Sequence, residues 1–199
     1  MCGFTGFIDF SGKKTDYQQI LENCYKQLSF RGPDENKRLI DEVKSIFISF
    51  ERLSFFDLSD SGMQPMISKN NRYIFLMNGE IYNFKNLDHQ LQISKIDVNN
   101  KSDAAVALEF ISNFGLKNFL NNVDGMFAIV LIDLHKKEIN FLSDPFSQKP
   151  LYYSIQRNSI YFSSDLRTIH FHQKFDKEID MFSVQEYFKK SFISAPKTI

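Results

Sequence analysis

The strongest constraint on the fold lies between residues 125 and 165, where four short apolar runs are separated by turn residues. Apolar runs of this length, bounded by turn residues, are typical of β-strands. Strands joined by short connections pair in antiparallel fashion, because parallel pairing needs a long crossover. We therefore expect one antiparallel meander, built in chain order from GMFAIVLIDL, KEINFLSD, KPLYYSI and SIYFSSD.

Further strands and helices are predicted on both sides of this region. Segments 4–10 and 45–58 have extended, apolar patterns, and 72–83 is a strand that runs into Asn78-Gly79. Ser102 is the expected N-cap of a helix, and Gly115 its expected C-cap. Helices are predicted over 17–30, 101–115, 164–171 and 180–190. The sequence thus predicts an α+β fold, with helices covering antiparallel sheets.

Charge and cysteine content limit the partners and the compartment. The 199-residue chain has 24 basic and 24 acidic residues, so its net charge is zero. This balance argues against a nucleic acid or an anionic membrane as partner. We expect no secretory signal and no membrane span, because no long apolar run occurs. With only Cys2 and Cys24 present, a disulfide scaffold is excluded, and a reducing cytoplasm is expected.

Metal binding is not expected either. The four histidines are scattered, and only His170-x-His172 brings two of them near each other in the sequence. Two imidazoles do not complete a zinc site, and the surrounding residues have a helical pattern in which positions two apart point to different faces.

Cys2 is the first candidate for catalysis, because it directly follows the initiator methionine. Removal of Met1 would leave Cys2 with both a thiol and a free α-amino group. The α-amine has a pKa of roughly 8, so a useful fraction is neutral near pH 7. It can then accept the thiol proton, and one residue supplies both nucleophile and general base. The alternative is that Cys2 is merely the second residue of a buried strand.

Asn78 and Gly79 offer hydrogen-bond donors of the kind that stabilise a tetrahedral oxyanion, namely a side-chain amide and a backbone N–H. The same Asn-Gly pair is also the strongest short signal for a type I′ hairpin turn. Pattern alone favours the turn, although a turn and an oxyanion hole can coincide, because glycine lets the backbone approach a ligand closely.

Two charged residues join the candidate thiol and oxyanion donors. Together these groups would suit a ligand that is an amino acid with a side-chain amide. Arg52 interrupts an apolar, extended segment, so it should be paired or face a site, where its planar guanidinium suits a carboxylate. Asp103 follows the N-cap candidate Ser102. It either stabilises the helix start or accepts a hydrogen bond from a ligand ammonium group.

Seven motifs in order give the chain a resemblance to the class II glutamine amidotransferases, in particular to the N-terminal glutaminase domain of glutamine-hydrolysing asparagine synthetases. The match covers essentially the whole chain. The motifs are MCGFTGF, RGPDE (31–35), ERLSFFDLSDSGMQPM (51–66), NGEIYN (78–83), SDAA (102–105), DGMFAIVLID (124–133) and DPFSQKPLYY (144–153). The segment ISAPKTI (193–199) resembles the connection to the family's second domain.

The resemblance implies an N-terminal nucleophile hydrolase fold, in which two antiparallel sheets lie between helical layers in an αββα sandwich. It implies a glutaminase domain over 1–185 and the start of a linker over 186–199. Cys2 matches the nucleophile, and Asn78 and Gly79 match the oxyanion hole. Arg52 matches the residue that binds the glutamine α-carboxylate. Glu80 lies in the substrate-lining stretch, and Asp103 matches the partner of the α-amino group.

The implied reaction converts L-glutamine to glutamate and ammonia through a γ-glutamyl thioester. No cofactor is implied for this domain. The ammonia would pass to a C-terminal ATP-pyrophosphatase-type synthetase domain that uses ATP and magnesium. That domain's S-G-G-x-D-S loop does not occur in the sequence, which predicts an excised domain or a truncated gene. The acceptor of the ammonia is aspartate or another carboxylate, and a homodimer is among the assemblies that the resemblance allows.

The chain departs from the family pattern at three positions. Ala105 replaces the glutamate of S-D-x-E, which is expected to cost helix-start stability of about 1 kcal/mol and no chemistry. Ser143 and Ser147, the other two departures, lie in a loop expected near the domain interface.

Two alternatives to a glutaminase remain. One is a glutamine-binding regulatory module without turnover, which Cys2 and Asn78-Gly79 disfavour. The other is an assembly scaffold, which has no support in the sequence.

Overall fold

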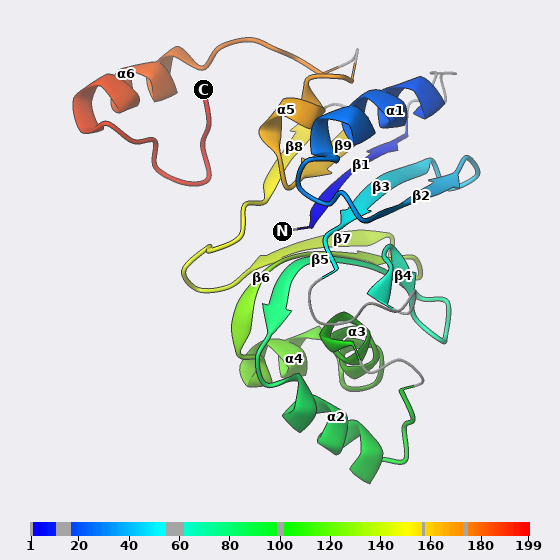
Figure 1. Cartoon of the computed structure of the whole chain (residues 1–199). Coiled ribbons are helices and arrows are strands. Elements are labelled where there is room, and N and C mark those ends of the chain that lie inside the picture. The colour runs from blue at the N-terminus through cyan, green and yellow to red at the C-terminus, as the bar shows by residue number, and fades with distance from the viewer. Residues whose placement is uncertain (1, 11–16, 55–61, 99–101, 157, 173–174) are drawn as a thin grey trace.

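Two antiparallel sheets form the centre of the molecule (Figure 1). The computed structural model describes residues 2–10, 17–54, 62–98, 102–156, 158–172 and 175–199. Sheet A has five strands in the order β2-β3-β1-β9-β8, and sheet B has four in the order β4-β5-β6-β7. Sheet A contains β1 (Gly3–Asp9), β2 (Glu35–Asp41), β3 (Ile46–Arg52), β8 (Tyr152–Gln156) and β9 (Ser159–Ser163). Sheet B contains β4 (Met66–Ile67), β5 (Tyr73–Ile81), β6 (Gly125–Asp133) and β7 (Glu138–Ser143).

Helices cover the outer face of each sheet. The helices α1 (Tyr17–Leu28) and α5 (Leu166–Ile169) pack on sheet A. The helices α2 (Phe84–Ile93), α3 (Asp103–Phe114) and α4 (Leu116–Asn122) pack on sheet B. A third apolar cluster fills the space between the sheets and includes Phe4, Phe50, Leu76 and Val130. The αββα sandwich and the α+β class are therefore confirmed.

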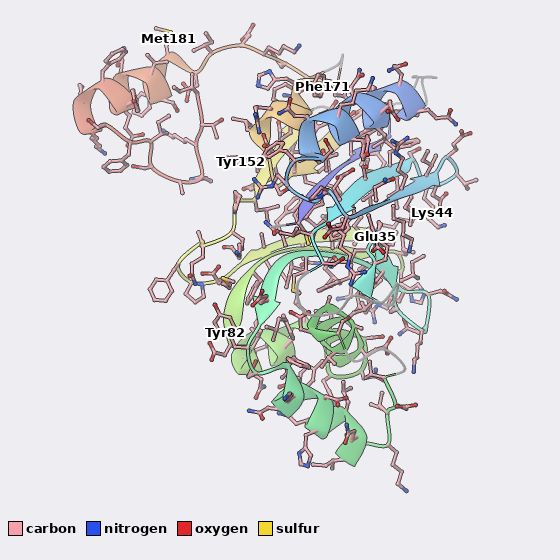
Figure 2. The ribbon with its side chains drawn as sticks, in the orientation of Figure 1. Glu35, Lys44, Tyr82, Tyr152, Phe171 and Met181 are labelled. Carbon is pink, nitrogen blue, oxygen red and sulfur yellow. The ribbon has the colours of Figure 1, made fainter. Side chains whose placement is uncertain are left out.

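The helix α6 (Met181–Lys190) lies to one side of these layers (Figure 1). Its Met181, labelled in Figure 2, is exposed, as are Phe182 and Phe188. The predicted domain boundary at residue 185 falls inside this helix, and the division at that residue stays a prediction.

The predicted single meander is wrong, because its four strands divide between the two sheets. The β6–β7 hairpin belongs to sheet B, whereas the β8–β9 hairpin belongs to sheet A. Asp144 ends β7, because its carboxylate accepts hydrogen bonds from the backbone N–H groups of Phe127, Phe146 and Gln148. Pro145 and Pro150 follow and have no N–H to continue a ladder. The chain therefore leaves one sheet here and enters the other.

Ser147, one of the departures from the family pattern, has an uncommon backbone conformation in this connection. Its φ is 50°, in the left-handed region that glycine adopts without a steric cost. The serine adopts this region although its Cβ makes the conformation less favourable than it is for glycine.

The helix and strand predictions were otherwise correct in kind, and the structure adds elements that the sequence did not indicate. The predicted helices correspond to α1, α3, α5 and α6, and Ser102 caps α3 by accepting a hydrogen bond from Ala105 N at 3.3 Å. The helix begins in this way without the family's glutamate at position 105. The elements missed from the sequence are α2, α4, β2 and β4.

A buried carboxyl group lies under α1, on the face of sheet A that turns away from sheet B. Glu51 is fully buried; Ser49 Oγ donates a hydrogen bond to its Oε1 at 2.6 Å. Its Oε2 has no hydrogen-bond partner among the described residues. Burial raises the pKa of Glu51 to about 7, although Ser49 and the Arg38 charge act in the opposite direction. Ionisation of this group therefore opposes folding.

Glu51→Gln is expected to stabilise the protein in a pH-dependent way. In the unfolded chain Glu51 has its ordinary pKa of 4.5, whereas in the folded chain its pKa is about 7. The free energy of unfolding of the wild-type protein therefore falls by up to about 3 kcal/mol as pH rises from 4.5 to 7. The variant does not show this fall, because glutamine cannot ionise. Urea unfolding of both proteins across this pH range measures the difference in unfolding free energy. A difference that does not change with pH would contradict this prediction.

Candidate active site

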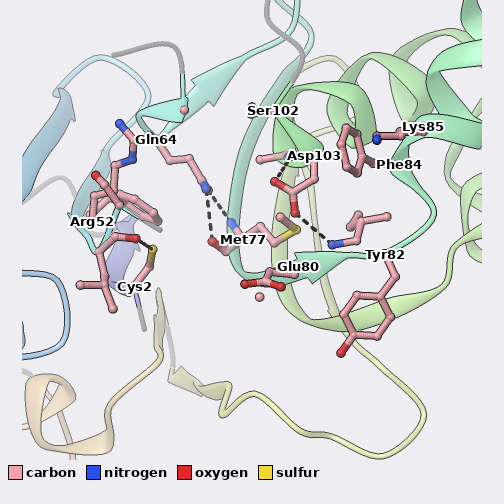
Figure 3. A pocket seen from close by; sticks show the side chains of 17 residues that line it. Cys2, Arg52, Gln64, Met77, Glu80, Tyr82, Phe84, Lys85, Ser102 and Asp103 are labelled. Atoms are coloured by element: carbon pink, nitrogen blue, oxygen red, sulfur yellow. Dashed lines mark hydrogen bonds between the residues drawn. The ribbon is translucent and has the colours of Figure 1, made fainter. Parts of the chain in front are cut away.

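A pocket of about 620 Å³ lies where the ends of β1, β3 and β5 meet the start of α3. The predicted site residues Cys2, Arg52, Gly79, Glu80 and Asp103 all line it (Figure 3). They come from both sheets and from one helix, although the sequence separates them by up to about a hundred positions. The structure thus brings the predicted residues together at one site, with Asn78 buried beside Gly79.

Cys2 is held at the pocket by the strand that follows it. β1 lies between β3 and β9 in sheet A, and every residue of β1 is buried. The thiol is half-buried; its Sγ donates a hydrogen bond to the Leu53 carbonyl oxygen at 3.7 Å. Burial raises the pKa of the Cys2 thiol, and the Leu53 bond and the Arg52 charge offset this in part. The group therefore needs a base to become a nucleophile near neutral pH.

Asn78 carries an unused hydrogen-bond donor in the interior. Along β5, the side chains of Ile74, Leu76 and Asn78 share one face, and the first two pack in the layer between the sheets, against which Cys2 also packs. Asn78 is 1% exposed, and its Nδ2 has no hydrogen-bond partner among the described residues. An unsatisfied buried donor costs about 1–3 kcal/mol, so its retention calls for a function.

The predicted hairpin turn at Asn78-Gly79 is wrong. Both residues lie within β5, opposite Ala128 and Phe127 of β6. The nine paired residues of β6 keep the chain extended through this point, where an isolated Asn-Gly would turn. Gly79 has φ 146°, and a Cβ on it would lie 2.0 Å from the Met126 carbonyl oxygen. Glycine is thus needed here for close approach of two strands and not for a turn.

Arg52 faces the pocket and is also paired. Its Nη1 donates to Glu35 Oε2 at 2.8 Å; the arginine side chain is 6% exposed and the glutamate 33%. The sequence did not identify Glu35 as this partner. Asp34 holds the same region, because its N–H bonds the Arg52 carbonyl oxygen at 3.1 Å and its carboxylate accepts from Ser54 N at 2.7 Å. The RGPDE and ERLS motifs therefore form one unit beside Cys2.

Asp103 and Glu80 place two carboxylates at the pocket. Asp103 accepts hydrogen bonds from the backbone N–H groups of Ile81 at 2.9 Å and Ala104 at 2.8 Å, and so joins the start of α3 to the end of β5. Burial raises the pKa of Asp103, these two bonds lower it, and the nearby Glu80 charge raises it further. The acidic side of the pocket suits a cationic group of a ligand.

Gln64 is a pocket residue that the sequence reasoning missed. Its side chain is buried, with the amide bonded to the backbone of Met77 on β5 (Figure 3). Gln64 lies within the ERLSFFDLSDSGMQPM motif, and this position in a family motif was the signal that could have identified it as a site residue. Residues 55–61 of that motif lie outside the described residues. The pocket is also lined by Tyr82, Phe84 and Lys85, which follow β5.

The histidine pair has a packing role where its contacts are described. The His172 ring packs edge-on against Phe7 and Tyr161, and the His170 ring packs against Phe175. The described part of the chain holds no group of three or more His, Cys, Asp or Glu side chains that could bind a metal. None of the helices in the described residues is long and apolar enough to cross a bilayer.

Known proteins resemble this chain over most of its length. The sequence profile of the "Glutamine amidotransferase domain" family matches residues 1–199. A "Probable asparagine synthetase [glutamine-hydrolyzing]" of Acanthamoeba polyphaga mimivirus is 33% identical over 174 residues, covering 85% of this chain and 31% of that protein. "Asparagine synthetase [glutamine-hydrolyzing] 1" of Bacillus subtilis is 29% identical, covering 100% of this chain and 31% of that protein. The chain thus spans about a third of the length of these relatives.

A solved structure shares the fold. The glutamine phosphoribosylpyrophosphate amidotransferase of Bacillus subtilis superposes with a TM-score of 0.64 at 19% identity, covering 85% of this chain and 43% of that one. The fold, the arrangement of the predicted residues around one pocket and the whole-chain profile match lead to the same assignment. The chain belongs to the class II glutamine amidotransferase family.

Proposed function

We propose that this chain hydrolyses L-glutamine to L-glutamate and ammonia, with Cys2 as the nucleophile. The observation that carries the proposal is the buried Asn78 amide, whose Nδ2 has no partner among the described residues, beside a pocket lined by the Cys2 thiol. A domain that only binds glutamine gains nothing from an unsatisfied buried donor on the residue that precedes Gly79 of the pocket. An enzyme that stabilises an oxyanion uses such a donor in the transition state.

Substrate recognition is assigned to the charged residues of the pocket. The Arg52 guanidinium would bind the glutamine α-carboxylate, and Asp103, with Glu80 beside it, would bind the α-ammonium group. Arg52 lies on β3 of sheet A, while Asp103 and Glu80 lie at the sheet B side of the pocket. Their opposite charges would orient the substrate, with its γ-amide directed to Cys2.

The reaction takes two steps at the γ-carbon. In the first, Cys2 Sγ attacks the amide carbon while its proton passes to the Cys2 α-amine, and Asn78 Nδ2 and Gly79 N–H donate hydrogen bonds to the oxyanion. The C–N bond then breaks, the leaving nitrogen takes that proton, and ammonia departs from a γ-glutamyl thioester. In the second, the amine takes a proton from water, the hydroxide attacks the thioester, the C–S bond breaks, and glutamate leaves as the thiol is restored.

The base in this scheme exists only when Cys2 is N-terminal, so the proposal requires removal of Met1. The raised pKa of the Cys2 thiol makes this requirement strict, because little thiolate forms unaided near pH 7. A protein that keeps Met1 should be inactive. Intact mass of the purified chain, measured beside its activity, tests this point.

The ammonia is proposed to serve an ATP-dependent synthetase domain, as the names and greater length of the relatives suggest. ATP and magnesium would bind in that domain, and no step within this chain uses them. Aspartate is the default acceptor, with another carboxylate as the alternative. A cytoplasmic location fits the two free cysteines, Cys2 and Cys24.

Glutamate release from L-glutamine by the purified chain is the direct test. Release with saturation kinetics supports the proposal. Stabilisation of the fold by glutamine without any glutamate release would contradict it, and would instead indicate a regulatory binding module.

Arg52→Met is expected to raise KM for glutamine by about 10- to 100-fold and to change kcat little. The reason is that a charge-assisted hydrogen bond to a substrate carboxylate contributes about 1.5–3 kcal/mol to binding. Steady-state kinetics separate the two constants. Glu35→Gln is the matched control, since it removes the charge of the Arg52 partner but leaves the guanidinium at the pocket. A fall in kcat with unchanged KM would show that Arg52 does not bind the substrate ground state.

A further inference from the structure

Gln64 continues the pairing of β4 with β5 through its side chain. β4 has only two residues, and it pairs Met66 with Phe75 and Ile67 with Ile74. The same register, extended by two residues, places Gln64 opposite Met77. At this position the Gln64 amide makes both bonds: Oε1 accepts from Met77 N at 2.5 Å, and Nε2 donates to the Met77 carbonyl oxygen at 3.2 Å (Figure 3). The amide therefore acts as one further peptide group of the edge strand.

The bonded carbonyl belongs to the peptide that leads directly into the oxyanion pair. Backbone N–H and C=O groups of alternate residues in a strand point to the same edge. On β5, the edge that carries the Met77 groups also carries Gly79 N–H and Ile81 N–H, and Ile81 N is held by the Asp103 carboxylate at 2.9 Å. Opposite Gly79, the Phe127 backbone bonds with Asp144 on the side away from β5. Gly79 N–H thus faces the pocket between two anchored residues of β5. Met77 is held by Gln64, and Ile81 is held by Asp103.

The side chains that hold these two residues, Gln64 and Asp103, are chemically different. Asp103 is expected to contact the substrate, so its contact with Ile81 depends on what occupies the pocket. Gln64 is buried and makes two neutral hydrogen bonds, one to the N–H of the Leu76–Met77 peptide and one to the carbonyl of the Met77–Asn78 peptide. Together the two bonds hold the peptide groups on both sides of Met77, and so restrict the backbone that leads into Asn78 and Gly79.

We propose that the Gln64 side chain is a positioning group for the oxyanion hole, which directs Asn78 Nδ2 and Gly79 N–H at the γ-carbonyl oxygen of the amide that Cys2 attacks. The proposal rests on the glutaminase activity proposed above. Oxyanion donors act in the transition state, and a misplacement of about 1 Å can cost on the order of 100-fold in rate. Loss of Gln64 should accordingly lower kcat and leave ground-state binding of glutamine in place.

Ser68 provides a matched control on the same edge. Its Oγ accepts a hydrogen bond from Tyr73 N at 2.9 Å, and Ser68 is as deeply buried as Gln64. It lies at the opposite end of β5 from Gly79. Ser68→Ala therefore removes a comparable side-chain bond to the β5 backbone, with a comparable loss of stability and no effect on the oxyanion donors.

The test compares Gln64→Met, Gln64→Glu and Ser68→Ala with the wild-type protein. Gln64→Met keeps the side-chain length and removes both bonds, so kcat should fall by about 10- to 100-fold. KM should stay within about threefold, and stabilisation by glutamine should persist, because these depend on binding. Ser68→Ala should keep the wild-type kcat. Wild-type kcat in folded Gln64→Met, or an equal kcat loss in Ser68→Ala, would overturn the proposal.

Gln64→Glu tests the same geometry even if the methionine variant folds poorly. The ionised carboxylate accepts from Met77 N but repels the Met77 carbonyl oxygen, whereas the protonated carboxyl makes both bonds. The kcat of Gln64→Glu relative to wild type should therefore rise as pH falls, and a pH-independent ratio would overturn the proposal.

Amide hydrogen exchange separates this proposal from the proposed function. Gln64→Met should speed exchange at Met77, whose N–H bonds Gln64, and at the adjoining Asn78, and Ser68→Ala should not. If the wild-type protein releases no glutamate, the proposed function fails, yet unchanged exchange at these two amides would still overturn the positioning role of Gln64.

Discussion

Cys2→Ala is expected to abolish glutamate release, with a loss of at least about 10³-fold, because no other described group in the pocket can form the thioester. The remaining residues still bind glutamine, so stabilisation by the substrate should persist. Glutamate release and glutamine-induced thermal shifts of both proteins, each with Met1 removed, measure the two effects. Loss of turnover with retained binding is the signature of a missing nucleophile.

Cys24→Ala is the matched control for this experiment. Cys24 lies on the buried face of α1, and burial raises the pKa of its thiol to about 12. Its replacement should lower stability through lost packing and leave turnover unchanged. Alkylation with iodoacetamide should likewise label Cys2 and spare Cys24. Glutamate release by Cys2→Ala at the wild-type rate would exclude the thioester mechanism.

Asn78→Ala is expected to lower kcat by about 10²- to 10³-fold without lowering stability. The substitution removes an oxyanion donor, which accounts for the kinetic loss. It also removes a buried donor that has no partner among the described residues, so the free energy of unfolding should hold or rise by about 1 kcal/mol. Most substitutions of buried residues destabilise, so this combination distinguishes a functional group from a structural one.

Asn113→Ala should give the opposite result. The Asn113 amide on α3 donates to the Glu109 carbonyl oxygen at 2.8 Å, away from the pocket residues. Its loss should lower the unfolding free energy by about 1 kcal/mol and leave kcat unchanged. Steady-state kinetics and urea unfolding of the two variants make the comparison. A clear fall in stability with wild-type kcat in Asn78→Ala would assign Asn78 a structural role.

Two predictions from local sequence, the turn at Asn78-Gly79 and the single meander, were wrong because tertiary contacts outweigh local preferences. Asn-Gly has the strongest local preference for a hairpin, yet β6 pairs across it and holds it in a strand. The divided meander has a similar origin. The local patterns of the four strands are alike, but the chain changes sheet after Asp144, whose carboxylate accepts from the backbone N–H groups of Phe127, Phe146 and Gln148. The pairing of β6 with β5 and the bond from Phe127 N to Asp144 join residues far apart in the sequence, so they leave no trace in a short window of it.

The sequence by itself determined the fold class, the buried strand behind Cys2, the caps of α3 and the identities of the principal pocket residues. These follow from patterns that span a few residues or from ordered motifs, which need no knowledge of distant contacts. Only the tertiary structure decided which donors remain free, that Arg52 pairs with Glu35, and that Gln64 supports Met77. Hydrogen-bond satisfaction depends on every neighbour in space, and those neighbours come from both sheets.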